Sequence, residues 1–238
     1  MATNRERAGY HVHLVTGGAH PRFAYTMGLR ASVGAELILP GCVFYMADEI
    51  QRIIVSVRER LLAGSSSGVT FTLEGLGSFT LRRAHATWTE SLMLSALEYE
   101  GVAEIAAFQL FPDAAHWTLD VPDMRLPWSA QAEPVWRWLH EPWPYEIPSH
   151  TTVLTNLAAL RGQRITAVSH WDGDEWEMFA GSPSDVEPAE ARVVPLGTLL
   201  GADPSLAPAL ELGVGRGLWR DTAGGEWLPW GCGPVPAR

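Results

Sequence analysis

The chain has 238 residues, of which 47% are hydrophobic and 18% are charged, so it can bury a sizeable core. Its net charge of −10 at pH 7 would repel a phosphate backbone, which argues against nucleic-acid binding. All 17 basic residues are arginine, so chemistry that needs a lysine, such as a Schiff base or a Walker-type phosphate site, is excluded. No apolar run reaches roughly twenty residues and no secretory signal is recognisable, so we expect a cytoplasmic protein without a membrane segment.

Strands and helices alternate along the first half of the chain. Alternating residues at 10–15 and 22–26 flank a Gly17-Gly18 turn, which predicts a hairpin, and 35–41 reads as a third short strand. Apolar residues then recur at three- and four-residue intervals over 46–62, which predicts an amphipathic helix. The next predicted elements are strands at 69–73 and 78–83, a helix opened by a Thr87/Glu90 capping box and closed by Gly101, and a buried strand at 102–111.

The second half begins with a proline-rich, extended stretch over 112–148, with one short helical segment at 135–140. Its further predicted elements are strands at 164–170 and 175–180 around an Asp172-Gly173 turn, a strand at 193–196, a helix from Asp203-Pro204 to Leu212, and a terminal hairpin. The sum predicts an α+β fold of mainly antiparallel strands and a few short helices, in two packed parts. We place these parts at 1–140 and 149–238.

Three separated motifs carry a resemblance to a known family. They are "GYHVHLV" at 9–15, "FAYTMGLRASVGAELILPG" at 23–41 and "AFQLFPDAAHWTLDVPDMRLPW" at 107–128. Over roughly the first 130 residues the chain thereby resembles the bacterial family called domain of unknown function 4262, a name that implies no activity. It departs from the family pattern at Ala35, where a proline is usual, and in a longer insertion between Asp113 and Pro127-Trp128.

The region from about 160 to 230 resembles a second, smaller module. The stretches "VSHWDGDEWEMF", "VVPLGTLLGADPSL" and "GLWRDTAGGEW" are similar to a module of bacterial immunity-type proteins. That resemblance implies binding of a protein partner.

Four residues of the first part are catalytic candidates. His11 and His13 lie two apart on a strand and so share one face, where they would bind a metal if Asp113 or His116 came close. Glu36 and Asp113 are candidate general bases, because a carboxylate in a cleft can have a raised pKa. The structural alternatives are hydrogen-bonded imidazoles on a half-buried strand and carboxylates that cap turns. With no third ligand fixed by the spacing, we assign no metal and no cofactor.

Three polar residues of the family motifs are candidates for ligand or partner contact. Tyr25 and Thr26 point to opposite faces of their strand, and we expect one of them to hydrogen-bond to Glu36. Gln109 is the third, from the Gln-hydrophobic-x-Pro-Asp motif.

Aromatic and acidic residues alternate in the predicted hairpin of the second part. Trp171 and Trp176 flank Asp172 and Asp174, and this combination would suit a basic protein partner, although a solvated turn explains it equally well. The eleven tryptophans could likewise line a binding groove or fill the core.

These observations favour a non-enzymatic protein-binding module of the immunity, antitoxin or defence kind. A small hydrolase or metal-dependent enzyme that uses His11, His13, Glu36 and Asp113 is one alternative. A small-molecule sensor with a pocket between the two parts is another. No oligomeric state follows from the residues.

Overall fold

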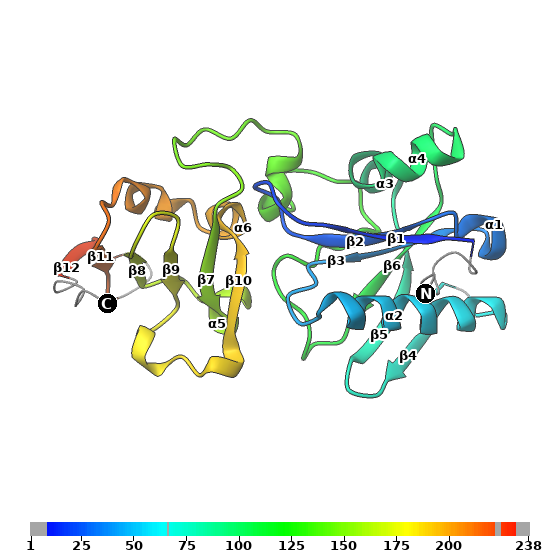
Figure 1. The fold of residues 1–238 in the computed structure, drawn as a ribbon, viewed down its shortest axis with the longest axis horizontal. Coiled ribbons are helices and arrows are strands. Elements are labelled where there is room, and N and C mark those ends of the chain that lie inside the picture. The colour runs from blue at the N-terminus through cyan, green and yellow to red at the C-terminus, as the bar shows by residue number, and fades with distance from the viewer. Residues whose placement is uncertain (1–8, 66, 222–224, 232–238) are drawn as a thin grey trace, which may run out of the picture. The chain divides into compact units, whose positions relative to one another are not determined.

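The computed structural model describes residues 9–65, 67–221 and 225–231, which divide into two compact units. Unit 1 consists of residues 22–117 and 121–133 together with the described residues up to 16, and unit 2 of residues 17–21, 118–120 and those from 134 onward. Each unit contains one six-stranded sheet of mostly antiparallel strands with short helices (Figure 1). The predicted α+β class with two parts is therefore confirmed.

Unit 1 contains a mixed sheet whose strand order is β1-β2-β3-β6-β5-β4. Its elements are β1 (His11–Val15), β2 (Phe23–Met27), α1 (Arg30–Val33), β3 (Glu36–Pro40), α2 (Ala47–Leu62), β4 (Thr70–Leu73), β5 (Gly77–Arg83), α3 (Ala86–Leu92), α4 (Leu94–Glu100) and β6 (Ala107–Pro112). β3 and β6 run parallel, and the remaining pairs are antiparallel. The parallel pair requires a crossover, which α2, β4, β5, α3 and α4 provide.

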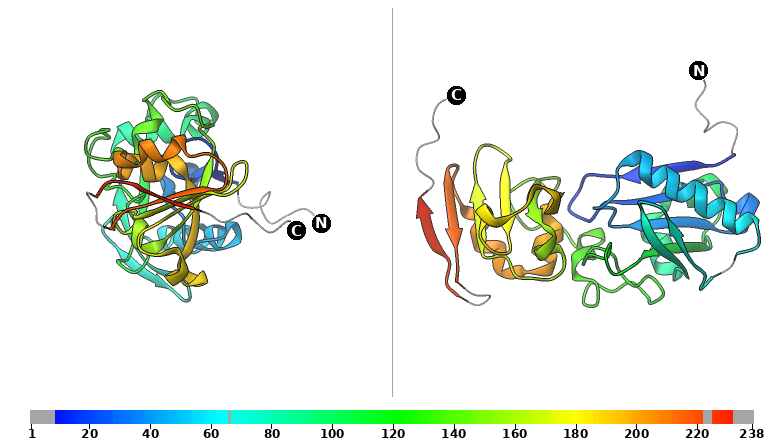
Figure 2. Two further views of the ribbon diagram at one scale, coloured as in Figure 1. Left: turned by 90° about the vertical axis from the view of Figure 1, so that its left-hand side faces the viewer. Right: turned by 90° about the horizontal axis from the view of Figure 1, so that it is seen from below.

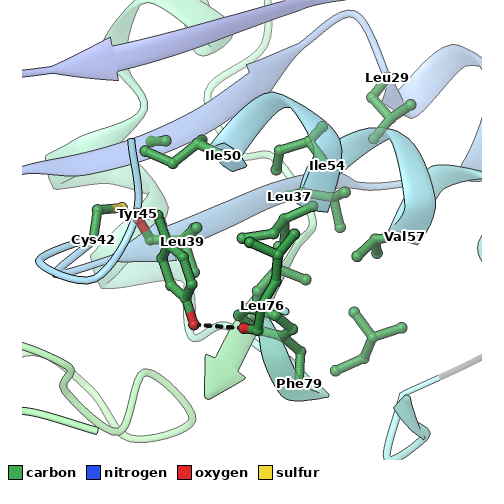
Figure 3. Close-up of a cluster of buried hydrophobic side chains, with 14 of the residues drawn as sticks. Leu29, Leu37, Leu39, Cys42, Tyr45, Ile50, Ile54, Val57, Leu76 and Phe79 are labelled. Atoms are coloured by element: carbon green, nitrogen blue, oxygen red, sulfur yellow. Dashed lines mark hydrogen bonds between the residues drawn. The ribbon is translucent and has the colours of Figure 1, made fainter. Parts of the chain in front are cut away.

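The core of unit 1 forms where α2 covers one face of this sheet (Figures 1 and 2). The helix buries Ile50, Ile53, Ile54, Val57 and Leu61, as the three- and four-residue spacing predicts. These side chains pack against alternate strand residues that point to the same face of the sheet, among them Leu37, Leu39 and Phe79. Figure 3 shows this cluster in close-up. The Tyr45 hydroxyl donates a 3.0 Å hydrogen bond to the carbonyl of Leu76 at the edge of this cluster, so its polar end is satisfied despite burial.

Unit 2 has the strand order β10-β7-β9-β8-β11-β12. Its elements are η1 (Pro134–Leu139), β7 (Thr152–Asn156), α5 (Leu157–Leu160), β8 (Ala167–His170), β9 (Trp176–Phe179), η2 (Pro183–Asp185), η3 (Pro188–Glu190), β10 (Ala191–Pro195), α6 (Leu196–Ala202), η4 (Pro204–Glu211), β11 (Arg216–Trp219) and β12 (Leu228–Gly231), where η marks a 3-10 helix. β7 and β9 are parallel, while the predicted hairpins β8–β9 and β11–β12 are both present.

Helix α6 packs closely because two of its residues have no side chain. A Cβ at Gly197 would lie 2.8 Å from Cδ1 of Trp138, and one at Gly201 would lie 2.5 Å from the carbonyl oxygen of Pro134. The Trp138 indole N–H donates to the Gly197 carbonyl at 2.9 Å. The helix can therefore approach η1 at backbone distance, a contact that any larger residue would block.

Two sequence predictions about local structure were wrong. The helix expected to begin at Thr87 is capped two residues earlier, where Nδ1 of His85 accepts the N–H of Thr87, and it breaks at Met93 into α3 and α4. The strand β7 and the helices α5 and α6 were not predicted. β7 and α5 follow the proline-rich stretch that was interpreted as the boundary between the two parts. Within the described ranges, no helix combines the length and apolarity that crossing a bilayer requires.

Candidate functional site

The carboxylate of Glu36 organises the turn between β2 and α1. It is fully buried and accepts hydrogen bonds from the Thr26 hydroxyl at 2.5 Å and from the backbone N–H groups of Gly28, Leu29 and Arg30 at 2.9–3.2 Å. The predicted bond to Tyr25 or Thr26 is thus confirmed for Thr26. Gly28 turns with φ +90°, a conformation that suits glycine. Both carboxylate oxygens accept hydrogen bonds from this turn. The Glu36 side chain therefore has a structural role, which is to hold the Tyr-Thr-Met-Gly-Leu motif in place.

The histidines of β1 lie beside β2 instead of around a common ligand point. His13 pairs with Tyr25 across the two strands, and their rings stack with centroids 5.3 Å apart. His11 pairs with Met27 and is exposed. The described residues contain no group of three or more His, Cys, Asp or Glu side chains placed to hold a metal ion.

Asp113 forms a pair with His116 just after the end of β6. Its Oδ1 lies 2.8 Å from Nδ1 of His116, and its Oδ2 accepts the Ser78 N–H at 2.6 Å. Burial raises the pKa of Asp113, but the hydrogen bonds from His116 and Ser78 outweigh it and hold that pKa below its ordinary value. The His116 ring stacks on Tyr45, whose own pKa is raised by burial and then by the charge of Asp113.

Glu36 and Asp113 lie at opposite ends of their strands. Glu36 pairs with Ala107, the first residue of β6, and Asp113 follows the last residue of that strand. Six residues at about 3.3 Å each put some 20 Å between them along the sheet. The structure brings Thr26 to Glu36 and His116 to Asp113, but it does not assemble these carboxylates into one site.

Gln109 is completely buried and holds a loop of unit 1 against the sheet. Its amide donates to the carbonyl of Pro122 at 2.7 Å and accepts the N–H of Met124 at 3.2 Å. Both ends of the side chain are therefore occupied by the backbone of this loop.

A groove with both acidic and apolar walls crosses the sheet of unit 2. It has a volume of about 270 Å³ and lies over β10, β7 and β9, beside the turn that precedes β9. Val193, Leu154 and Glu177 form one cross-strand row in it, because Val193 pairs with Leu154 and Leu154 with Glu177. Val193 is 59% exposed, so this row presents apolar surface to solvent at the edge strand β10.

Carboxylates surround this apolar row. Asp174 and Glu175 line the groove from the turn before β9, next to Trp171. No ion pair joins Asp174, Glu175 or Glu177 to another residue in the described part of the chain. The groove therefore presents uncompensated negative charge around exposed apolar surface.

The turn that carries these residues is fixed by hydrogen bonds. The N–H of Trp171 donates to the carbonyl of Glu175 at 3.0 Å, and Nε2 of His170 lies 2.8 Å from the carbonyl oxygen of Gly173. Trp176 is only 4% exposed and stacks on His170 with ring centroids 3.9 Å apart. Of the two predicted contact tryptophans, Trp171 thus stands at the rim, whereas the Trp176 ring belongs to the packed interior. Asp172 is exposed in the same turn, outside the groove lining.

Sequence reasoning found the acidic turn but missed the apolar row. Leu154 was missed because the strand 152–156 was not predicted, and Val193 because nothing in its own segment indicates a neighbour. The alternation of "TVLTN", with β-branched residues at 152, 153 and 155, was the signal that could have revealed β7.

Comparison with known proteins identifies one family. The family model described as "Domain of unknown function (DUF4262)" matches residues 4–133, which is more than half of the chain. No curated protein and no solved structure matches.

Proposed function

Because this chain belongs to the DUF4262 family, whose description assigns no activity, we propose a function from the geometry of the groove in unit 2. The proposed function is recognition of a basic protein segment, as in an immunity, antitoxin or defence protein. The groove lies beyond the residues that the family model matches, so this function would be a property of the second unit.

One observation carries the proposal, namely that Asp174, Glu175 and Glu177 surround the exposed Val193 and the half-buried Leu154 without a cationic partner in the described residues. A partner segment with arginine or lysine beside apolar residues would neutralise these charges and cover Leu154 and Val193. Complementary charge of this kind increases association rates and selects between partners. The hydrogen-bonded turn adds to this, because a preformed surface loses little conformational entropy on binding.

Synthetic peptides test the proposal directly. An array of arginine- and lysine-bearing peptides that also contain apolar residues is compared with acidic and neutral counterparts of the same length, and the strongest binder is titrated while tryptophan fluorescence is recorded. We expect basic peptides to bind and their affinity to fall as salt is raised. The double variant Asp174→Asn/Glu177→Gln should weaken the best peptide about tenfold or more.

A matched control removes two carboxylates from unit 1. The variant Asp48→Asn/Glu59→Gln changes the net charge by the same amount on α2 and should leave peptide affinity unchanged. Equal binding of acidic and basic peptides, or equal loss in both double variants, would refute recognition by this groove.

Fewer of the candidate residues support the enzymatic alternative than support the binding function. Asp113 and His116 form a hydrogen-bonded pair, but Glu36 is committed to the β2–α1 turn and His13 to Tyr25. No observation on the described residues favours a particular reaction, so we advance the binding function alone.

A further inference from the structure

A second groove, in unit 1, concentrates positive charge in a protein that is acidic as a whole. It has a volume of about 930 Å³ and lies around the end of β5. Three arginines, Arg82, Arg83 and Arg125, line it together with His85, whereas Glu104 is the one acidic residue among its described lining residues. With a net charge of −10 over the whole chain, this local excess of cations is a distinct feature.

Arg82 is held in place at the wall of this groove. Its guanidinium carbon lies 3.3 Å from the centroid of the Phe111 ring, on the neighbouring strand β6. A guanidinium stacked on an aromatic face keeps its N–H groups available at its edge, where they can donate to an anion. The aromatic contact therefore orients Arg82 without using its hydrogen-bonding capacity.

The cations of the groove repel one another. Burial, followed by the positive charge of Arg125, lowers the pKa of Arg82, against the opposing effect of Asp123. Asp123 itself is engaged by Arg125, whose Nε donates to its Oδ1 at 2.8 Å. One carboxylate thus compensates one guanidinium, while Arg82 and Arg83 form no ion pair with a described residue.

His85 adds a ring N–H donor to the same wall. Its Nδ1 accepts the Thr87 N–H at 3.3 Å, which places the ring proton on Nε2 in the neutral tautomer. An Nε2–H donor next to arginines suits an anion with several acceptor oxygens.

We propose that this groove binds the phosphate group of a small, non-aromatic phosphate ester, with Arg82 as its main contact and Arg125 as a second one, through the N–H groups that its ion pair with Asp123 leaves unused. The planar fork of a guanidinium matches phosphate oxygens in a bidentate arrangement. The volume lies within the range typical of small-molecule sites. Apart from the His85 imidazole, no lining residue in the described part of the chain carries an aromatic ring on which a nucleobase could stack, so a sugar phosphate fits better than a nucleotide or a nucleic acid.

Calorimetric titration of the full chain with ribose 5-phosphate tests this site, with unphosphorylated ribose as the ligand control. We expect ribose 5-phosphate to bind at low ionic strength, ribose to give no heat, and added salt to weaken the phosphate ester. Arg82→Gln should reduce the affinity by roughly tenfold or more, since a hydrogen bond between charged groups contributes on that scale. Arg125→Gln should reduce it by less, because Asp123 already compensates the charge of Arg125.

Arg52→Gln is the matched protein control. It removes the same charge from an exposed position on α2 of the same unit, and the affinity should not change. If Arg82→Gln fails to fold by circular dichroism, the exposed Arg83→Gln takes its place, with a smaller expected loss.

Three outcomes would overturn the assignment. These are no heat with ribose 5-phosphate at millimolar concentration, equal loss of affinity in Arg52→Gln, and tighter binding of a single-stranded oligonucleotide than of ribose 5-phosphate.

Discussion

The hydroxyl of Thr26 donates a 2.5 Å hydrogen bond to the buried carboxylate of Glu36, and the same hydroxyl oxygen accepts the N–H of Leu37. Through this pair, the end of β2 and the start of β3 are fixed to one another on either side of α1, which lies between them in the chain. The relationship explains why a Tyr-Thr-Met-Gly-Leu sequence and a glutamate seven residues beyond its leucine occur together: they are two halves of one turn.

Replacing Glu36 by glutamine should destabilise the protein by about 3 kcal/mol. The glutamine amide would direct an N–H donor at backbone N–H groups and would leave buried donors unsatisfied. Thr26→Val, which removes the donor to Glu36 and the acceptor of the Leu37 N–H but leaves the carboxylate in place, should cost about half as much. Urea unfolding followed by tryptophan fluorescence measures both, and Glu59→Gln, on the exposed face of α2, is the control that should be neutral. Equal stability of Glu36→Gln and Glu59→Gln would show that the anchor is dispensable.

Replacing Gly197 by alanine should destabilise unit 2 by about 2 kcal/mol or more, because the new methyl group would clash with the Trp138 ring and with the backbone of Ala19. A loss of stability would show the clash, because replacing glycine by alanine inside a helix otherwise stabilises a protein by about 1 kcal/mol. Gly213→Ala is the matched control, because no atom lies within 4 Å of a Cβ at that position. The two variants are compared by their urea midpoints.

Asp203 should make stability depend on pH in the acid range. Burial raises its pKa, but hydrogen bonds from Ser205 and Arg220 and the charge of Arg220 outweigh burial and hold the pKa below its ordinary value. A carboxyl whose pKa is lower in the folded state contributes stability above its ordinary pKa, about 3.9, and that contribution is lost as the pH falls below it.

The free energy of unfolding should therefore decrease less between pH 6 and pH 3 in Asp203→Asn than in the unmodified chain, although the variant is less stable at pH 6. Asp172→Asn removes an exposed carboxylate of the same unit and should retain the original slope. Parallel pH profiles for Asp203→Asn and the unmodified chain would contradict the role assigned to Asp203.

His85 should act as a helix cap that asparagine can replace. Its Nδ1 satisfies the Thr87 N–H at the start of α3, so His85→Ala should cost about 1 kcal/mol. His85→Asn should restore most of this stability, because asparagine caps helices well, while the Nε2 donor in the groove is lost. Thermal unfolding measures the capping, and titration with ribose 5-phosphate measures the donor separately. A destabilised His85→Asn would mean that packing of the ring, and not capping, is what matters.

Local signals predicted much of unit 1 and part of unit 2. The spacing of Ile50, Ile53, Ile54 and Val57 determined α2 and its buried face, and Asp203 followed by Pro204 marked the start of η4. The Asp172-Gly173 turn predicted the hairpin β8–β9. Each of these signals acts over a few residues, so it can be read without knowing what lies across the sheet.

The sequence by itself determined the α+β class, the family of the first half, and a hydrogen bond from Tyr25 or Thr26 to Glu36, because periodicity, turn residues and short polar motifs are local properties of the chain. The structure selected Thr26 as the donor. Only the tertiary structure decided that Leu154, Val193 and Glu177 form one row, that Arg82 and Arg125 share a groove, and that Asp113 lies far from Glu36. The physical reason is that alternation along a strand defines its faces but not its neighbours. The parallel pairings of β3 with β6 and of β7 with β9 join segments that no local pattern connects.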